Sequence, residues 1–208
     1  TNHGRLTAAA AAKFGLKSIL ILSGPAPEHM TGNLILDKLM GAELYFADNT
    51  PFANLPKEEA AKKMAELMDK VTKQAISDFE SKGEKVYSIP VGGSNLLGIA
   101  GYLECAKEIK EQCEQMGIVP KHLLCGYGSA GTFGGLSLGA KYYDRPLKVY
   151  GVAVSEKSEA DIQTTVDYIK QASAHYEMGL HVTRDVFYPE TEYLDLGYNI
   201  PDENNRKY

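Results

Sequence analysis

Residues 121–140, with the sequence KHLLCGYGSAGTFGGLSLGA, decide the fold that this chain predicts. Lys121–Cys125 is an apolar, strand-like run, and Thr132–Ala140 is typical of a helix. The glycine-rich turn between them lies where backbone amides and the positive end of a helix dipole can hold a phosphate. Ser129 and Thr132 add hydroxyl donors. The plain alternative is a tight strand-to-helix turn that needs glycine only for its backbone conformation.

The same alternation of strands and helices continues on both sides of this turn. Towards the N-terminus, periodicity predicts strands over residues 17–22, 43–47 and 85–89 and helices over residues 4–14, 33–40, 57–81 and 97–116. Towards the C-terminus it predicts a strand over 147–154, a helix over 158–176 and a polar, turn-rich tail over 188–208. Parallel neighbouring strands need crossover connections, and helices usually supply them. We therefore expect an α/β fold of parallel sheets with flanking helices.

Composition and charge exclude several classes of function. The 208 residues are 44% hydrophobic and 24% charged, as in an ordinary globular protein, and 22 basic against 27 acidic side chains leave a net charge of −5. We therefore expect no nucleic-acid partner. The longest apolar runs fall far short of the roughly 20 residues that span a bilayer, so no membrane segment is expected. The three cysteines show no C-x-x-C spacing, which favours a reducing, cytoplasmic location over a disulfide framework.

Catalytic and cofactor motifs of other kinds find little support. The five histidines form no metal-binding pattern, so no metal is expected, and no Gly-x-Ser-x-Gly elbow occurs. Gly126, Gly128 and Gly131 satisfy G-x-G-x-x-G, but the acidic residue that would bind a ribose, Glu156, lies further on than a dinucleotide site requires. A simple phosphate cradle is the better interpretation.

Two further segments precede predicted helices. Thr1–Arg5 lies before an alanine-rich run, where Thr1 or Asn2 is a candidate N-cap, and Arg5 at the positive end of that helix needs an anionic partner or a tertiary contact. Gly92–Asn95 follows a predicted strand. A cap and a hinge are equally compatible with this second segment.

Five stretches together resemble a known family: TNHGRLTAAAAAKFGL (1–16), GNLILD (32–37), IPVGGSN (89–95), GSAGT (128–132) and GYNIP (197–201). They resemble the pyridoxal-phosphate enzymes that include D-cysteine desulfhydrase and 1-aminocyclopropane-1-carboxylate deaminase. The resemblance implies the tryptophan synthase β-like fold, also called fold type II. It further implies a smaller domain over residues 1–89, part of the larger cofactor-binding domain over residues 90–208, and a homodimer.

The resemblance also assigns site residues. Asn2 matches the asparagine that binds the phenolic oxygen of pyridoxal 5'-phosphate, and Tyr198 matches an active-site tyrosine that lies against the substrate and is expected to help transfer a proton. Thr1 stands where the family has a serine that touches the substrate carboxylate, and its extra methyl group bears on pocket size and substrate choice. The phosphate is expected to be bound by Gly128, Ser129, Ala130, Gly131 and Thr132.

In such enzymes the lysine that forms the Schiff base lies upstream of the Thr-Asn-His motif, with which this sequence begins. A second tyrosine and the residue facing the pyridine nitrogen lie downstream of the position of Tyr208. We therefore expect a chain truncated at both ends, without the Schiff-base lysine.

The implied activity is a lyase reaction on a small amino acid. The first expectation is α,β-elimination from D-cysteine to pyruvate, hydrogen sulfide and ammonia, because His3, Gly4 and Arg5 look like the desulfhydrase form of the motif. The alternatives are 1-aminocyclopropane-1-carboxylate deaminase and cysteate sulfo-lyase. A catalytically idle fragment that only binds pyridoxal phosphate also remains open.

Overall fold

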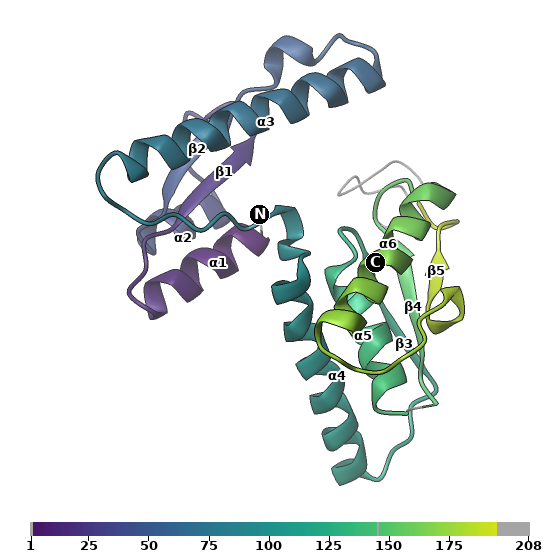
Figure 1. Cartoon of the computed structure of the whole chain (residues 1–208). Coiled ribbons are helices and arrows are strands. Elements are labelled where there is room, and N and C mark those ends of the chain that lie inside the picture. The colour runs from purple at the N-terminus through teal and green to yellow at the C-terminus, as the bar shows by residue number, and fades with distance from the viewer. Residues whose placement is uncertain (1, 145, 195–208) are drawn as a thin grey trace. The chain divides into compact units, whose positions relative to one another are not determined.

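The computed structural model describes residues 2–144 and 146–194, and the chain divides into two compact units, 1–88 and 89–208 (Figure 1). Each unit combines parallel strands with helices. The predicted α/β class with parallel sheets and flanking helices is confirmed. None of the helices in the described part of the chain is long and apolar enough to cross a membrane.

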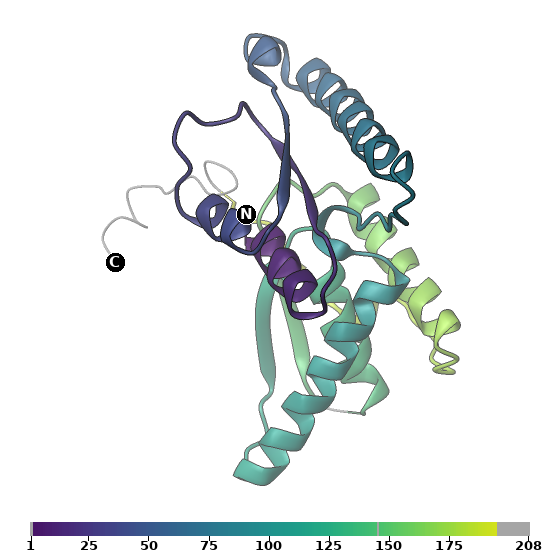
Figure 2. The ribbon, with the colours of Figure 1, turned by 90° about the vertical axis from the view of Figure 1, so that its left-hand side faces the viewer.

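The first unit is built around two parallel strands. Its elements in chain order are α1 (Asn2–Lys13), β1 (Ile19–Ser23), α2 (Asn33–Leu39), β2 (Glu43–Ala47), the 3-10 turn η1 (Thr50–Phe52) and α3 (Lys57–Glu80). β1 and β2 pair from Ile19 opposite Glu43 to Ser23 opposite Ala47. Figures 1 and 2 show α3 along one side of this pair and α1 with α2 on the other. The strands are thereby covered on both faces, as parallel strands usually are.

The second unit holds a three-stranded parallel sheet in the order β3-β4-β5. Its elements are the turn η2 (Val91–Gly93), α4 (Leu96–Met116), β3 (His122–Tyr127), α5 (Gly131–Tyr142), β4 (Lys148–Ala153), α6 (Glu159–His175), the turn η3 (Arg184–Val186) and β5 (Tyr188–Glu190). β3 and β4 pair along their whole length, so that Tyr127 lies opposite Ala153. The carboxyl ends of both strands therefore lie side by side.

Helix α5 forms the centre of the second unit. All of its residues from Phe133 to Ala140 are buried, because the sheet covers one side of the helix while α4 and α6 pack against others (Figure 2). The Phe133 ring lies against β4, where a Cβ atom on Gly151 would come within 2.5 Å of it. Glycine at 151 therefore allows the helix to approach the sheet closely.

Two further glycines bring α4 close to α5. A Cβ atom added at Gly135 would lie 2.4 Å from the Cβ of Tyr102, and one added at Gly139 would lie 2.4 Å from the Cβ of Ala106. Real Cβ atoms do not approach so closely, so the helix contact depends on the missing side chains. Because α4 packs so closely on α5, the N-terminus of α4 lies beside the loop that precedes α5.

The caps of α4 and α6 are formed by side chains. Asn95 accepts a hydrogen bond from the Gly98 amide at 2.7 Å through Oδ1, so Gly92–Asn95 ends in a helix cap. Ser158 and Asp161 form a reciprocal capping box at the start of α6.

The predicted strand over residues 85–89 is wrong. These residues form neither strand nor helix, and Tyr87 and Ile89 are 66% and 48% exposed. A strand exists only when a neighbour completes its hydrogen bonds, and no described strand pairs with this segment. Conversely, β5 lies in the tail that the sequence predicts to be irregular. Here a partner, β4, is present, and Tyr188 stacks on Tyr150 at 5.1 Å between ring centroids.

Candidate functional site

The loop of residues 128–130 connects β3 to α5, as the sequence predicts, and it presents backbone N–H groups. Ala130 precedes α5 in a left-handed conformation with φ of 72° and forms no side-chain cap. Among the residues that the structure describes, no acceptor binds the amides of Thr132 and Phe133 in the first turn. In the second unit α4 and α6 have capping side chains, whereas α5, like α2 and α3 of the first unit, has no side-chain cap, and its first-turn amides are donors for a ligand.

Ser94 joins the other glycine-rich segment to this loop. Its hydroxyl donates a hydrogen bond to the Ser129 hydroxyl at 2.7 Å and accepts one from the Gly131 amide at 3.1 Å. Glycine is required on both sides of the contact. A Cβ atom on Gly92 would lie 2.0 Å from the Ser129 Oγ, and one on Gly131 would lie 2.7 Å from the Ser94 Oγ. The two glycine motifs that the sequence shows separately therefore form one structure.

Lys157 is a cation beside the loop that sequence reasoning missed. Its Nζ donates a hydrogen bond to the Gly128 carbonyl oxygen at 2.8 Å and lies 4.9 Å from the centroid of the Tyr127 ring. The residue follows β4, whose carboxyl end lies next to that of β3. Ligand sites of parallel sheets gather at such ends, so position after the next strand is the signal that would have pointed to it.

Asn2 begins α1 in the first unit and is held by a second asparagine. Its Oδ1 accepts a hydrogen bond at 3.1 Å from the Nδ2 of Asn33, which begins α2. With the oxygen engaged, the Asn2 side-chain amide has N–H donors left for an acceptor such as a phenolic oxygen. Asn33 lies in the stretch 32–37 of the resemblance but was not identified as a site residue.

The structure brings together the predicted phosphate residues. Gly128 to Thr132 form one continuous loop and helix start in the second unit, and Asn2 belongs to the other unit. Thr1 and Tyr198 lie outside the described residues. Arg5 forms no ion pair with a described carboxylate, so the structure does not supply the anionic partner that its position at the helix start calls for.

Burial governs the titration of the groups around the loop. Desolvation raises the pKa of the Cys125 thiol to about 11, so this residue is a protonated thiol at neutral pH and no nucleophile. Desolvation also raises the pKa of Tyr127, whose hydroxyl shares a 2.6 Å hydrogen bond with that of Thr165. Neither group is therefore a nucleophile, and the chemistry that the loop offers is the binding of an anion by its backbone N–H and hydroxyl groups.

Comparisons with known proteins agree with this chemistry. The family model described as "Pyridoxal-phosphate dependent enzyme" matches residues 1–204. Two proteins carry the name "Putative 1-aminocyclopropane-1-carboxylate deaminase". The one from Thermotoga maritima is 35% identical over 99% of this chain and 60% of its own length. The one from Pyrococcus abyssi is 35% identical over 82% of this chain and 48% of its own length.

A solved structure described as an "ACC deaminase homologue" matches with a TM-score of 0.66 and 31% identity over 91% of this chain. The match covers 51% of that structure. The chain thus spans about half to three fifths of the length of these relatives.

Proposed function

This chain belongs to the family of pyridoxal-phosphate dependent enzymes, and from that premise we propose that it takes part in a lyase reaction, α,β-elimination in the first place, that releases ammonia from a small amino acid. The observation that carries the proposal is the loop before α5, which leaves two first-turn amides without an acceptor among the described residues. A phosphate monoester fits this donor set, because it carries only acceptor oxygens and a negative charge.

In the proposal the second unit binds the phosphate of the cofactor. The amides at the start of α5 and the hydroxyls of Ser129 and Thr132 are its donors, and Gly128, Ala130 and Gly131 shape the loop. Ser94 fixes this arrangement through its two hydrogen bonds to the loop. We assign the second unit to the larger, cofactor-binding domain of the family and the first unit to the smaller domain.

The residues of the first unit have the task of orienting the ring of the cofactor and the substrate. Asn2 is the proposed donor to the phenolic oxygen, with Asn33 holding its amide in the correct orientation. The Thr1 hydroxyl is the proposed partner of the substrate carboxylate, and Tyr198 is the proposed proton-transfer residue. When bound, pyridoxal phosphate supplies an electron sink for the electrons of the broken bond at Cα.

D-Cysteine is our first choice of substrate, on the His3-Gly4-Arg5 form of the motif. Elimination with water would convert it into pyruvate, hydrogen sulfide and ammonia. The second choice is 1-aminocyclopropane-1-carboxylate, because the curated relatives at 35% identity carry the name of that deaminase. Its ring opening with water would give 2-oxobutyrate and ammonia. Cysteate would give sulfite in place of sulfide.

The substrates are distinguished by measuring products side by side. The protein is incubated with pyridoxal phosphate and each amino acid in turn, both enantiomers of cysteine included, and ammonia, sulfide, sulfite and the oxo acid are quantified. Sulfide with equimolar pyruvate from D-cysteine supports the first choice, and 2-oxobutyrate supports the second. Binding of the cofactor without any product supports a catalytically idle cofactor-binding chain.

A second measurement tests the assignment of residues. The proposal gives none of the lysines in residues 1–208 the role of holding the cofactor as an imine. Borohydride reduction in the presence of pyridoxal phosphate should therefore leave no single lysine labelled in stoichiometric amount, as read by mass spectrometry of peptides. Complete labelling of one lysine would contradict this assignment and require a new alignment of the site. The homodimer implied by the resemblance stays a prediction, which a molar mass measured by light scattering would test.

A further inference from the structure

We propose that Lys157 is a positioning residue of the phosphate loop and that its side chain strengthens the binding of a phosphate monoester there. The phosphate loop is defined as residues 128–132. The inference rests on the proposed function, because it takes the phosphate of the cofactor as the group bound by this loop. It concerns a residue outside every stretch that carries the family resemblance.

The side chain of Lys157 is held in one place by two contacts. Its ammonium donates to the Gly128 carbonyl oxygen at 2.8 Å and lies over the Tyr127 ring, with 4.9 Å between Nζ and the ring centroid. Tyr127 itself is 1% exposed and is fixed through the hydrogen bond between its hydroxyl and that of Thr165. A lysine that is anchored by a carbonyl and a ring differs from a solvated surface lysine, whose ammonium samples many positions.

The bond to Gly128 determines which way the loop presents its donors. The carbonyl of residue 128 and the N–H of Ser129 belong to one planar trans peptide unit, in which the two groups point in opposite directions. Holding the oxygen at Lys157 therefore fixes the direction of the Ser129 amide. It also keeps the carbonyl oxygen from turning towards a bound anion, which it would repel.

The charge of Lys157 also favours the binding of an anion by the phosphate loop. In the described part of the chain no other lysine or arginine is hydrogen-bonded to the phosphate loop, and the first turn of α5 carries no acidic residue. The nearby carboxylate of Asp161 accepts hydrogen bonds from the backbone and hydroxyl of Ser158, and the Lys157 ammonium donates to the Gly128 carbonyl. The Lys157 ammonium, which contacts the loop directly, thus adds positive charge to the partial charge of the helix terminus, and the interaction with the Asp161 carboxylate offsets part of it.

The test compares two ligands that differ only in the phosphate. Pyridoxine 5'-phosphate and pyridoxine lack the aldehyde of pyridoxal phosphate, so neither forms an imine with surface lysines. Their dissociation constants are measured by titration calorimetry on the whole chain. The variants are Lys157→Met, Lys157→Gln and Lys157→Arg, with circular dichroism to verify folding. Lys148→Met is the matched control, because Lys148 also lies over a tyrosine ring, at 5.4 Å from the Tyr188 centroid.

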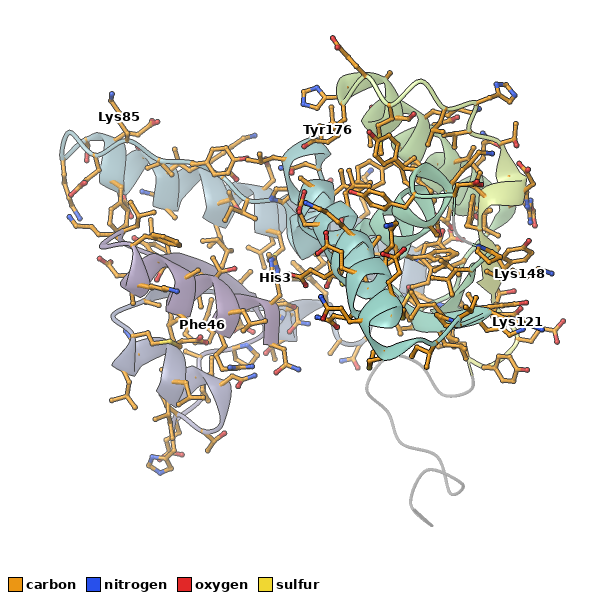
Figure 3. The ribbon with its side chains drawn as sticks, turned by 90° about the horizontal axis from the view of Figure 1, so that it is seen from below. His3, Phe46, Lys85, Lys121, Lys148 and Tyr176 are labelled. Carbon is orange, nitrogen blue, oxygen red and sulfur yellow. The ribbon has the colours of Figure 1, made fainter. Side chains whose placement is uncertain are left out.

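Lys148 stands at the start of β4, near Lys121 before β3, whereas the phosphate loop follows the other end of these strands (Figure 3). We expect Lys157→Met to bind pyridoxine 5'-phosphate about tenfold more weakly, which equals about 1.4 kcal/mol, and to bind pyridoxine as before. Lys157→Arg should remain close to the wild type, since it keeps charge and donor. Lys157→Gln should fall between the two, and Lys148→Met should change nothing. High salt should reduce the difference that is due to charge.

Two results would overturn the inference by itself. One is a wild type that binds pyridoxine 5'-phosphate and a folded Lys157→Met that binds it equally well. The other is an equal loss of affinity for both ligands, which would mean that the side chain only supports the fold. No binding of pyridoxine 5'-phosphate by the wild type would instead overturn the proposed function, and this inference with it.

Discussion

Replacement of Gly139 by alanine tests the role of the close contact between α4 and α5 in stability. The added methyl carbon would lie 2.4 Å from the Cβ of Ala106 and 3.7 Å from the Leu103 carbonyl oxygen. Two carbon atoms rest at about 3.5–4.0 Å, so the helices must separate locally by about 1 Å or more. Neither Cβ atom can rotate away, because each is bonded directly to a helical backbone.

The expected cost follows from two opposing effects. Overpacking of a core costs about 1–3 kcal/mol, and rigid neighbours place this site near the upper end. Alanine gains about 1 kcal/mol over glycine within a helix. We therefore expect Gly139→Ala to lower the free energy of unfolding by about 2 kcal/mol. The control is Gly101→Ala on α4, where nothing lies within 4 Å of the new methyl group, so the same chemical change should stabilise by about 1 kcal/mol.

Urea unfolding followed by far-UV circular dichroism measures both changes. The double variant Gly139→Ala with Ala106→Gly removes the colliding carbon. Its free energy of unfolding should be at least about 1 kcal/mol higher than the value expected from adding the changes of the two single variants. Equal stabilities of the Gly139→Ala and Gly101→Ala variants, or additivity within about 0.5 kcal/mol in the cycle, would refute the reasoning.

Three further substitutions and one reactivity measurement have definite expected outcomes. Ser94→Ala removes two hydrogen bonds to the phosphate loop and should cost about 1 kcal/mol in urea unfolding, whereas an unchanged midpoint would contradict their role. Asp37→Ala should stabilise by about 1 kcal/mol, because the Asp37 carboxyl group is fully buried, its oxygens have no partner among the described residues, and the smaller side chain adds no bulk to the site; a loss of stability would reveal a partner. Hydrogen bonds from Ser158 lower the pKa of Asp161 in the folded protein. The stabilisation that these bonds give to the ionised carboxylate is therefore present above the ordinary pKa of about 3.9 and is lost as the pH falls through the lower pKa of the folded state. Ser158→Ala should accordingly lower the melting temperature at neutral pH and much less in strong acid, and a pH-independent difference would oppose this account. Burial raises the pKa of the Cys125 thiol to about 11, so Cys125 should react with iodoacetamide about 100-fold more slowly than a free thiol at neutral pH, as mass spectrometry of native and unfolded protein can verify.

The sequence was sufficient for features that depend on neighbours along the chain. It predicts the strand before the phosphate loop and the helix after it, and the structure places their limits at Tyr127 and Gly131. Hydrophobic periodicity and glycine-rich turns are local signals, which is why they could be read without the fold. The predicted strand over residues 85–89 is wrong because a strand also needs a neighbouring strand to complete its hydrogen bonds, and the sequence of the segment itself carries no information on that neighbour.

The candidate site likewise has a part that adjacent residues predict and a part that depends on tertiary contacts. Glycines and hydroxyl residues in 128–132 predict an anion-binding loop by themselves, because strand, turn and helix follow one another directly. Ser94 and Lys157 were not predicted, and they reach the loop from 35 and 29 residues away along the chain. Their contacts exist because β4 pairs with β3 and because α5 lacks side chains where α4 crosses it. Strand order and close helix packing are properties of the folded chain, so only the tertiary structure decided which residues hold the loop in place.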